Sequence, residues 1–372
     1  MRRIKILYTI PNFDTSGSGK ALLNLALGLH PNRFEVEIMC LHDKGDFFKT
    51  VKASGFKIHI VDFLPKERPV YRMFTQCFKL SRIFKSIQPD IIHSFHYSSN
   101  YTEAIAAKMA GVRWVFTKKN MSWGGSSKNS WKLRSLLADK IVVQNKDMIR
   151  LFYSDSSKIK LIPRGINLEQ FMPASKDVNL VFNYTTNSRA RILLCVANLV
   201  PIKGIEIAIK AFKEIHDQFM DWEFWIVGDN QNKYAKSLLS FVEDISLGHK
   251  IKFVGRQISV KKFLDVSELF VLPSLDKGEG SPVALLEAMA NSKVVLGSNV
   301  PGISDQLEDF KNHLFKAGDH LDLSNKLNYW MSKDTKELHE AGTLFNEHVK
   351  NNFTIALEVK RHETFYKTVC KS

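Results

Sequence analysis

The sequence predicts an α/β protein built from two Rossmann-like domains. Three observations lead to this prediction: the length of 372 residues, apolar runs that alternate with segments of helical period, and a polar stretch near the middle. A chain of this length is long enough for two domains that each bury a core. Alternation of strands with helices is typical of βαβ units and of parallel sheets covered on both faces.

Twelve short runs rich in β-branched and aromatic residues are the expected strands. In the first half they are RIKILYTI, FEVEIMCL, KIHIVDF, PDIIHSF, WVFTKK, KIVVQN and KIKLIP. In the second half they are RILLCVANL, EFWIVGD, KIKFVG, LFVLPS and KVVLGS. The polar stretch 173–190 separates the halves, which gives domains of 1–185 and 186–352. Residues 353–372 are expected to form a helix that packs back on the N-terminal domain.

The composition is that of a globular protein, with 44% hydrophobic and 24% charged residues. The start, MRRIKILYTIPNF, predicts a first strand and not a signal peptide, and no run of about 18 apolar residues predicts a membrane span. The cysteines are far apart and form no CxxC pair, which argues against a zinc site or a disulfide framework. They are Cys40, Cys77, Cys195 and Cys370. A cytoplasmic location is therefore expected.

Positive charge is concentrated in the first half. Residues 1–185 carry 29 Lys and Arg against 14 Asp and Glu, whereas residues 186–372 carry 24 of each. A basic face indicates a polyanionic partner such as nucleic acid, an anionic membrane or a phosphorylated substrate.

One basic segment, VYRMFTQCFKLSRIFKSIQ, has the pattern of an amphipathic helix. We expect its apolar face to hold Phe74, Phe78, Ile83, Phe84 and Ile87. The cations between them are Arg72, Lys79, Arg82 and Lys85. Two interpretations stay open: a core-facing helix with a solvated basic side, or a helix that lies on a membrane surface.

In open α/β sheets, ligands bind at the loops that follow the strands. The loops to consider are TIPNFDTSGSGK, ANLVPIKG and PSLDKGEGSP, and we expect all three to face one cleft between the domains. The first resembles the tail of a P-loop, but Asp14 and Ala21 occupy positions where that motif needs Gly and Ser or Thr. We therefore interpret Gly17 and Gly19 as a turn that lets a substrate approach the backbone.

The segment LFVLPSLDKGEGSPVALLEAMA (269–290) is the most informative. A strand is followed by a loop with Gly278 and Gly280, and Pro282 is expected in the first turn of a helix. The free N–H groups of a helix N-terminus attract phosphate. Glu279 and Glu287 add carboxylates that accept hydrogen bonds from sugar or ribose hydroxyls. Together these groups suit a nucleotide sugar.

This segment resembles the E-x7-E motif of retaining glycosyltransferases with the GT-B fold, the large group-4 glycosyltransferase family. Further segments resemble the family in the same order along the chain: LIPRGINLEQF, ILLCVANLVPIKGIEIAIKAF, EFWIVGDN, IKFVGRQISVKKFLDVSELFVLPS and KVVLGSNVPGISDQL. The resemblance implies a GT-B architecture: two Rossmann-like domains with a cleft between them and a C-terminal helix.

The resemblance also implies the donor-binding residues. They are Gly17, Asn198, Lys203, Gly228, Arg256, Gln257, Glu279, Gly280, Ser281, Pro282, Val283 and Glu287. Glu287 would bind the ribose, Glu279 the donor sugar, and Lys203 would neutralise the departing diphosphate. Relatives often carry Arg where this chain has Asn198. They also more often carry Asn and Asp where this chain has Arg164 and Asn167.

On the acceptor side the resemblance is looser. His93 matches a histidine common in the family and is expected to be catalytic, although a histidine after a strand is often structural. His96 is the alternative cleft residue, and Asn100 lies in the loop beyond it. A metal site at the two histidines lacks a third ligand. No D-x-D sequence occurs, so catalysis is expected to need no metal and no cofactor besides the donor.

The sequence thus predicts a retaining, hexosyltransferase-type enzyme. It would move a sugar from a UDP- or GDP-linked donor to a saccharide, lipid-linked, in cell-surface polysaccharide or glycolipid biosynthesis. We expect it on the inner face of the cytoplasmic membrane, peripherally bound to anionic lipid, with no nucleic acid partner. The alternatives are a nucleotide-sugar epimerase of the same fold and a non-catalytic protein that binds nucleotide sugars or polyanions.

Overall fold

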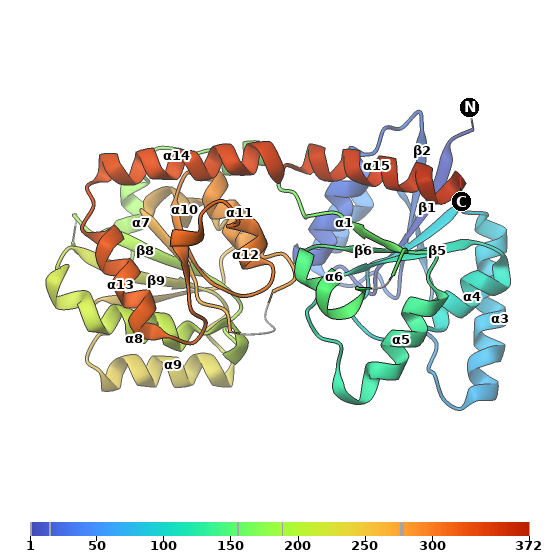
Figure 1. Ribbon diagram of the computed structural model, residues 1–372, viewed down its shortest axis with the longest axis horizontal. Helices are drawn as coiled ribbons and strands as arrows, with labels where there is room; N and C mark the ends of the chain where they lie inside the picture. The colour runs from blue at the N-terminus through green and yellow to red at the C-terminus, as the bar shows by residue number, and fades with distance from the viewer. Residues whose placement is uncertain (1, 15, 155, 188, 276–278, 372) are drawn as a thin grey trace. The chain divides into compact units, whose positions relative to one another are not determined.

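The computed structural model describes residues 2–14, 16–154, 156–187, 189–275 and 279–371 (Figure 1). Gly278 of the expected donor loop lies outside these residues. The chain divides into two compact units. Unit 1 comprises Met1–Pro163 and Ile355–Ser372, and unit 2 comprises Arg164–Thr354.

The sheet of unit 1 has seven strands in the order β3-β2-β1-β4-β5-β6-β7. All neighbouring strands are parallel. The strands match the seven expected runs, and the five inner strands are mostly buried because helices cover both faces, whereas the edge strands β3 and β7 are partly exposed. They are β1 (Ile4–Thr9), β2 (Phe34–Cys40), β3 (Lys57–Ile60), β4 (Ile91–Ser94), β5 (Arg113–Lys118), β6 (Lys140–Val143) and β7 (Ile159–Leu161).

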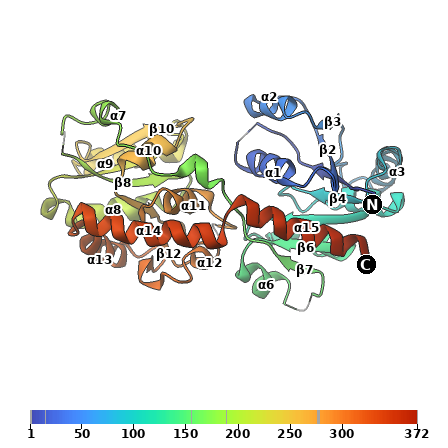
Figure 2. The same cartoon turned by 90° about the horizontal axis from the view of Figure 1, so that it is seen from above.

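The helices of unit 1 lie on both sides of this sheet, with α1 and α15 on one side and α3, α4 and α5 on the other (Figure 1). They are α1 (Ser16–Gly28), α2 (Asp46–Ala53), α3 (Val70–Ile87), α4 (Thr102–Ala110), α5 (Lys128–Leu137), α6 (Lys146–Phe152) and α15 (Ile355–Lys371), with a 3-10 turn η1 (Gly125–Ser127). The C-terminal helix α15 lies beside α1 (Figure 2) and places Val359 and Tyr366 in the core of unit 1. The Tyr366 hydroxyl is 2.9 Å from that of Tyr8 in β1.

The sheet of unit 2 has six parallel strands in the order β10-β9-β8-β11-β12-β13. Five match the expected runs. The sixth, β13, was not predicted, because two residues are too few to show strand periodicity. The strands are β8 (Arg191–Val196), β9 (Trp222–Val227), β10 (Ile251–Gly255), β11 (Leu269–Leu272), β12 (Val294–Ser298) and β13 (Leu314–Phe315).

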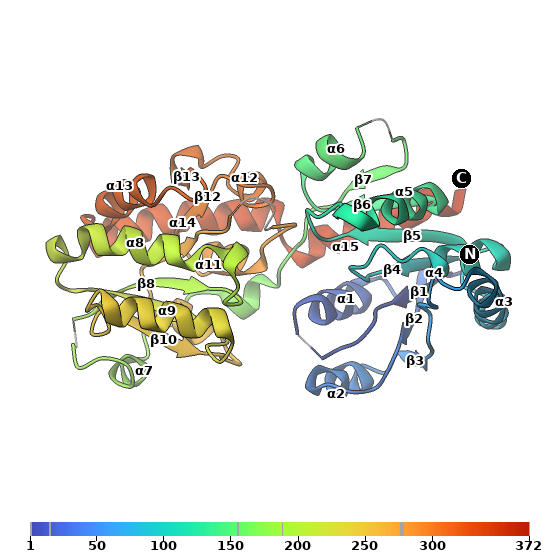
Figure 3. The same ribbon diagram turned by 90° about the horizontal axis from the view of Figure 1, so that it is seen from below.

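In unit 2, α8, α9 and α13 lie on one side of the sheet, and α10, α11 and α14 lie on the other (Figures 1 and 3). Helix α8 illustrates why these helices pack on the sheet: its buried residues Ile205, Ala208, Ile209 and Phe212 recur at helical spacing and form one apolar face. The helices are α7 (Val178–Phe182), α8 (Ile205–Ile215), α9 (Lys233–Asp244), α10 (Lys261–Val266), α11 (Val283–Ala290), α12 (Ile303–Gln306), α13 (His320–Met331) and α14 (Thr335–Asn352). The 3-10 turns are η2 (Leu168–Phe171), η3 (Pro201–Lys203), η4 (His216–Gln218) and η5 (Lys311–His313).

The division between the units differs from the expected boundary at 185/186. It falls after Pro163, so the segment that follows belongs to unit 2. The physical reason is hydrophobic burial: Ile166, Phe171 and Val181 join the core formed by β8–β12. The segment is polar on average, but these apolar side chains anchor it to the second sheet.

Helix α3 also differs from expectation in the face that it buries. Its core side holds Met73, Cys77, Leu80, Ser81, Phe84 and Ile87. Phe74 and Phe78, expected on the same apolar face as Phe84 and Ile87, are instead about half exposed. The helix therefore has apolar side chains on two faces, and α4 and the sheet can cover only one of them. No helix among the described residues is long and apolar enough to cross a membrane.

Candidate active site

Four loops at one edge of the unit 2 sheet carry the expected donor-site residues. The strands β10, β9, β8 and β11 are consecutive neighbours, and all run parallel. Asn198, Gly228, Arg256 and Glu279 each follow one of them. Because the carboxyl ends of parallel strands share an edge, residues far apart in sequence meet there.

An ion pair between Lys203 and Glu279 lies at the centre of this edge. The two residues are 76 positions apart, yet the Lys203 ammonium donates a hydrogen bond to Oε1 of Glu279. The Ser274 hydroxyl donates to the same oxygen at 2.6 Å. Both charged side chains are largely buried, with 19% and 7% of their surfaces exposed. The structure therefore brings together two residues that the sequence had placed in one site.

Gly204 fixes the position of Lys203. Its φ of +62° lies in the left-handed region that favours glycine, and a Cβ atom would stand 2.1 Å from the carbonyl oxygen of Pro273. The Leu275 amide also donates to the carbonyl of Ile202 at 2.8 Å. The loops after β8 and β11 are thus in direct backbone contact, and the ion pair spans them.

Helix α11 begins at Val283, shortly after Glu279 in the sequence. Pro282 is the N-cap residue and not part of the first turn, and no side chain caps the helix. The first N–H groups of α11 therefore lack a side-chain acceptor from the cap, as in an anion site. Ser281 accepts a hydrogen bond from the Gln306 amide at 3.1 Å. Glu287 is half-buried, one turn beyond Val283.

The remaining donor-side residues have more varied surroundings. A Cβ atom at Gly228 would stand 2.1 Å from the carbonyl oxygen of Ala197, so this position needs glycine for packing. Neighbouring Asn198 is exposed, and so is Arg256. The side-chain amide of Gln257 is engaged in a local hydrogen bond, which it donates to the carbonyl of Val254 at 3.0 Å. Gly280 is buried.

In unit 1, the structure contradicts the catalytic role expected for His93. The residue is fully buried, and its ring nitrogens lie 2.7 Å from the Tyr366 hydroxyl and 2.8 Å from that of Thr117. Burial, followed by the neighbouring His362 ring and the Lys119 ammonium, keeps its pKa well below the ordinary value. His93 is a neutral core residue that links α15 to the sheet.

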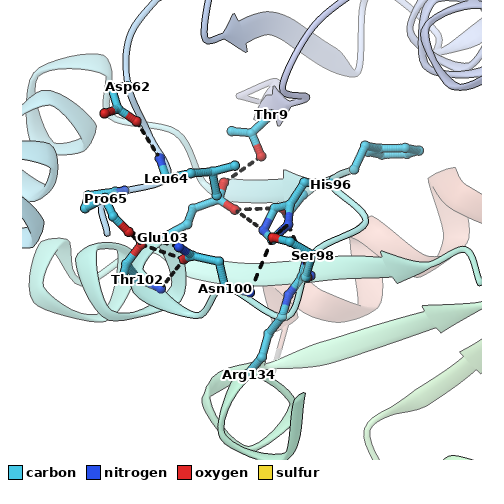
Figure 4. Close-up of polar contacts among 12 residues, drawn as sticks. Thr9, Asp62, Leu64, Pro65, His96, Ser98, Asn100, Thr102, Glu103 and Arg134 are labelled. Atoms are coloured by element: carbon cyan, nitrogen blue, oxygen red, sulfur yellow. Dashed lines mark hydrogen bonds and ion pairs between the residues drawn. The ribbon is translucent and has the colours of Figure 1, made fainter. Parts of the chain in front are cut away.

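His96 lies nearer the strand ends but is also buried (Figure 4). Burial, followed by the Arg134 charge, lowers its pKa to about 4. The ring is therefore neutral, and its 3.5 Å approach to Glu103 is not a charge pair. The Ser98 hydroxyl lies 3.0 Å from His96 Nδ1. His96 thus contacts the loop after β4 through Ser98, and its own ring is not open to solvent.

Asn100 organises the start of α4 (Figure 4). Its side-chain oxygen accepts from the Thr102 amide at 2.8 Å and from the Thr102 hydroxyl at 2.7 Å. Its amide donates to the carbonyl of Pro65 at 2.9 Å. The expected acceptor residue is therefore engaged in local structure, half-buried.

Gly17 and Gly19 do not form the turn expected between the first strand and helix. Both lie within α1, which already begins at Ser16. Gly17 is exposed at this helix start, whereas Gly19 packs beneath the ring of Phe13.

The buried histidines predict acid sensitivity of folding. The pKa values of His96, His362 and His313 are lowered to about 4, mainly by burial. The folded state then binds fewer protons than the unfolded state between pH 6.5 and pH 4, so stability is complete above this window and is lost as pH falls through it. Each residue contributes roughly 3 kcal/mol across the full window.

We therefore expect the urea midpoint to fall steadily from pH 7 to pH 5. A His362→Gln variant should show a shallower fall, because one of these groups is removed. The matched control is His339→Gln, at an exposed position on α14, which should keep the wild-type slope. If the urea midpoint fell equally with pH in all three proteins, the buried histidines would not be the origin of the acid sensitivity.

Comparison with known proteins identifies the family. The family model for glycosyl transferases group 1 matches residues 179–343, and the model for glycosyltransferase family 4 matches residues 15–170. The chain belongs to this GT-B glycosyltransferase family. It is a glycosyltransferase.

Relatives of the glycosyltransferase span nearly its whole length. An Escherichia coli UDP-Gal:α-D-GlcNAc-diphosphoundecaprenol α-1,3-galactosyltransferase is 26% identical, covering 91% of this chain and 90% of the relative. A Campylobacter jejuni N,N'-diacetylbacillosaminyl-diphospho-undecaprenol α-1,3-N-acetylgalactosaminyltransferase is 22% identical, covering 82% and 84%. Anabaena HepE, solved with UDP and glucose, has a TM-score of 0.83 at 17% identity, covering 100% of both chains. The structural likeness shows the fold.

Three residues at the candidate donor site were not predicted from the sequence. Ser274 holds Glu279, the Ser298 hydroxyl donates to the carbonyl of Ser274 at 2.5 Å, and Gln306 holds Ser281. Ser274 and Ser298 each lie at or just beyond a strand end, which is the signal that was available. Among the described residues, no group of three or more His, Cys, Asp or Glu side chains is placed to hold a metal ion.

Proposed function

We propose that this glycosyltransferase moves a sugar from a nucleoside-diphosphate sugar to a saccharide carried on a polyprenyl diphosphate, with retention of the anomeric configuration. The observation that supports a nucleotide-sugar donor is the Lys203–Glu279 ion pair. Glu279 lies three residues before Pro282, the N-cap residue of α11, where no side chain caps the helix. A cation and free backbone N–H groups suit a diphosphate, and the adjacent carboxylate suits a sugar hydroxyl.

In the proposed reaction, the bond between the anomeric carbon and the diphosphate oxygen breaks, and its electron pair stays on the diphosphate. The acceptor hydroxyl oxygen bonds to the anomeric carbon on the face from which the diphosphate departs, and its proton leaves with the diphosphate. Negative charge therefore grows on the leaving oxygen, where Lys203 and the dipole of α11 stabilise it. Since these groups supply the positive charge, we propose that the reaction needs no metal and no further cofactor.

The lipid-linked acceptor is proposed from the relatives. Both near-full-length relatives named above act on saccharides attached to an undecaprenyl diphosphate. A capsular polysaccharide biosynthesis glycosyltransferase of Staphylococcus aureus is also similar, at 24% identity over 84% of the chain. We propose a role in cell-surface polysaccharide or glycolipid assembly, at the inner face of the cytoplasmic membrane, where the basic first half favours anionic lipid. In unit 1, His96 and Asn100 would position the acceptor loop.

The test is a transfer assay with a panel of UDP- and GDP-sugars and a short-chain polyprenyl-diphosphate saccharide, with NMR of the new linkage. Release of nucleoside diphosphate that depends on acceptor, an α-linked product from an α-linked donor, and an unchanged rate in chelator would support the proposal. Conversion of the donor to an epimer without acceptor would favour the epimerase. Tight donor binding without turnover would favour a non-catalytic binding protein.

Glu287 is predicted to bind the donor ribose. Replacing it with Ala should raise KM for the donor at least tenfold, by about 1.4 kcal/mol or more, because two ribose hydroxyls lose a charged acceptor. The drop in kcat should be smaller. Glu214→Ala, at an exposed position on α8, is the matched control and should leave both constants unchanged. An unchanged donor KM in Glu287→Ala would contradict the assignment.

A further inference from the structure

Helix α3 carries a surface that the proposed reaction does not use. Four large apolar side chains on its outer side are more than half exposed: Val70 (56%), Tyr71 (67%), Phe74 (51%) and Phe78 (53%). With 3.6 residues per turn they fall within an arc of about 100°. We call these four side chains the α3 apolar strip. Isolated exposed apolar residues are ordinary, but four in one strip indicate a binding surface.

Basic side chains border this strip. Arg82 and Lys85 continue it toward the C-terminal end of the helix, and Arg72 and Lys79 both lie beyond its Tyr71 edge. All four cations are exposed, and the helix contains no acidic residue. The Arg72 and Arg82 guanidinium groups lie 5.7 and 6.0 Å from the ring centres of Tyr71 and Phe78. The surface therefore joins aromatic rings with four positive charges, and α3 itself supplies no acidic residue.

The strip is not a poorly packed core face. A neighbouring face of α3 buries Met73, Cys77, Leu80 and Phe84 in the core beside α4. Helix α3 lies next to α4 at the outer edge of unit 1 (Figure 1). The core thus fixes the rotation of α3 about its axis, and this rotation turns the α3 apolar strip outward.

We propose that the α3 apolar strip and its four cations dock side-on to an anionic lipid bilayer surface. Aromatic rings and aliphatic side chains enter the boundary between headgroups and acyl chains, while Arg and Lys remain at the level of the lipid phosphates. The absence of acidic residues on this helix favours an anionic surface over a mixed-charge protein partner. The inference rests on the proposed function in one respect: a lipid-linked acceptor gives the docking a purpose.

The test is flotation of the full-length protein with vesicles of phosphatidylcholine, with or without 30% phosphatidylglycerol. We expect binding to the anionic vesicles at low salt, and at least a tenfold loss in the Phe74→Ser, Phe78→Ser double variant. The matched control is Leu321→Ser, Tyr329→Ser, which alters two exposed apolar side chains on α13 and should bind like wild type. Circular dichroism melts establish that each variant is folded.

A charge variant separates the electrostatic contribution to vesicle binding from the apolar one. Arg82→Gln with Lys85→Gln should lower binding to anionic vesicles severalfold and reduce its salt dependence. Lys233→Gln with Lys236→Gln, on α9, removes equal charge elsewhere and should have little effect. Transfer to a short-chain acceptor dispersed without vesicles should be unchanged in every variant, so loss of docking and failure of the proposed reaction are distinguishable.

Three results would overturn the inference. The wild-type protein could fail to float with anionic vesicles at low salt. The α3 double variant could float as well as wild type. Sedimentation could show a dimer that dissociates in the Phe74→Ser, Phe78→Ser variant without any lipid binding, in which case the strip pairs two copies of the chain.

Discussion

Replacing Lys203 with Met is expected to lower kcat by about 10²–10³-fold, with a much smaller change in donor KM. Removal of one group that stabilises developing negative charge costs about 3–4 kcal/mol in comparable sites. Lys203 carries such a charge at the edge of the sheet, and Met keeps most of its length. The measurement is steady-state transfer with saturating donor and acceptor, after donor and acceptor are identified.

Two controls make this result specific. Lys210→Met removes a partly exposed lysine that pairs with Glu206 on α8, and it should leave kcat unchanged. Lys203→Met also leaves the buried Glu279 carboxylate without its cation, which costs stability. The double variant Lys203→Met, Glu279→Gln removes this unpaired charge. If the double variant regains wild-type turnover, the lysine only neutralises Glu279, and its catalytic role is wrong.

Replacing Gly204 with Ala is expected to destabilise unit 2 by on the order of 3–5 kcal/mol, because two costs combine at this position. The backbone adopts φ +62°, and the new Cβ would meet the Pro273 carbonyl oxygen at 2.1 Å. Neither atom belongs to a flexible side chain, so the loops after β8 and β11 would have to separate. Thermal and urea unfolding measure the loss.

The matched control for this variant is Gly248→Ala. A Cβ at Gly248 meets no atom within 4 Å, and its φ lies outside the left-handed region. This substitution should change stability by less than about 1 kcal/mol. If Gly204→Ala proved as stable as Gly248→Ala while activity fell, the glycine would serve the donor directly and not the geometry of the loops. Saturating nucleoside diphosphate should restore part of the lost stability in Gly204→Ala, by mass action.

Much of the fold could be predicted because strand periodicity is a local signal. Twelve of the thirteen strands in the described part of the chain coincide with apolar runs, and β13 was missed only because it has two residues. Glu279 and Lys203 could also be identified, since each follows a strand within a segment that resembles a family motif. That they form an ion pair depends on β8 and β11 being neighbours, which is a matter of sheet order.

The direction in which a side chain points was harder to predict. His93 follows the expected strand pattern, but its neighbours include Tyr366 from the other end of the chain, and these bury it. Phe74 and Phe78 fit an apolar helical face as well as Met73 and Cys77 do. Only the packing of α3 against α4 and the sheet selects which face enters the core.

The sequence by itself determined the α/β class, most strands and the family, because these depend on short-range patterns of apolar residues and on motifs. The tertiary structure decided the division after Pro163, the pairing of Lys203 with Glu279, the burial of His93 and the outward strip on α3. Each of these depends on contacts between segments distant in sequence. Burial energy is gained only where such segments meet, so it is fixed by the packing of the whole unit and not by local pattern.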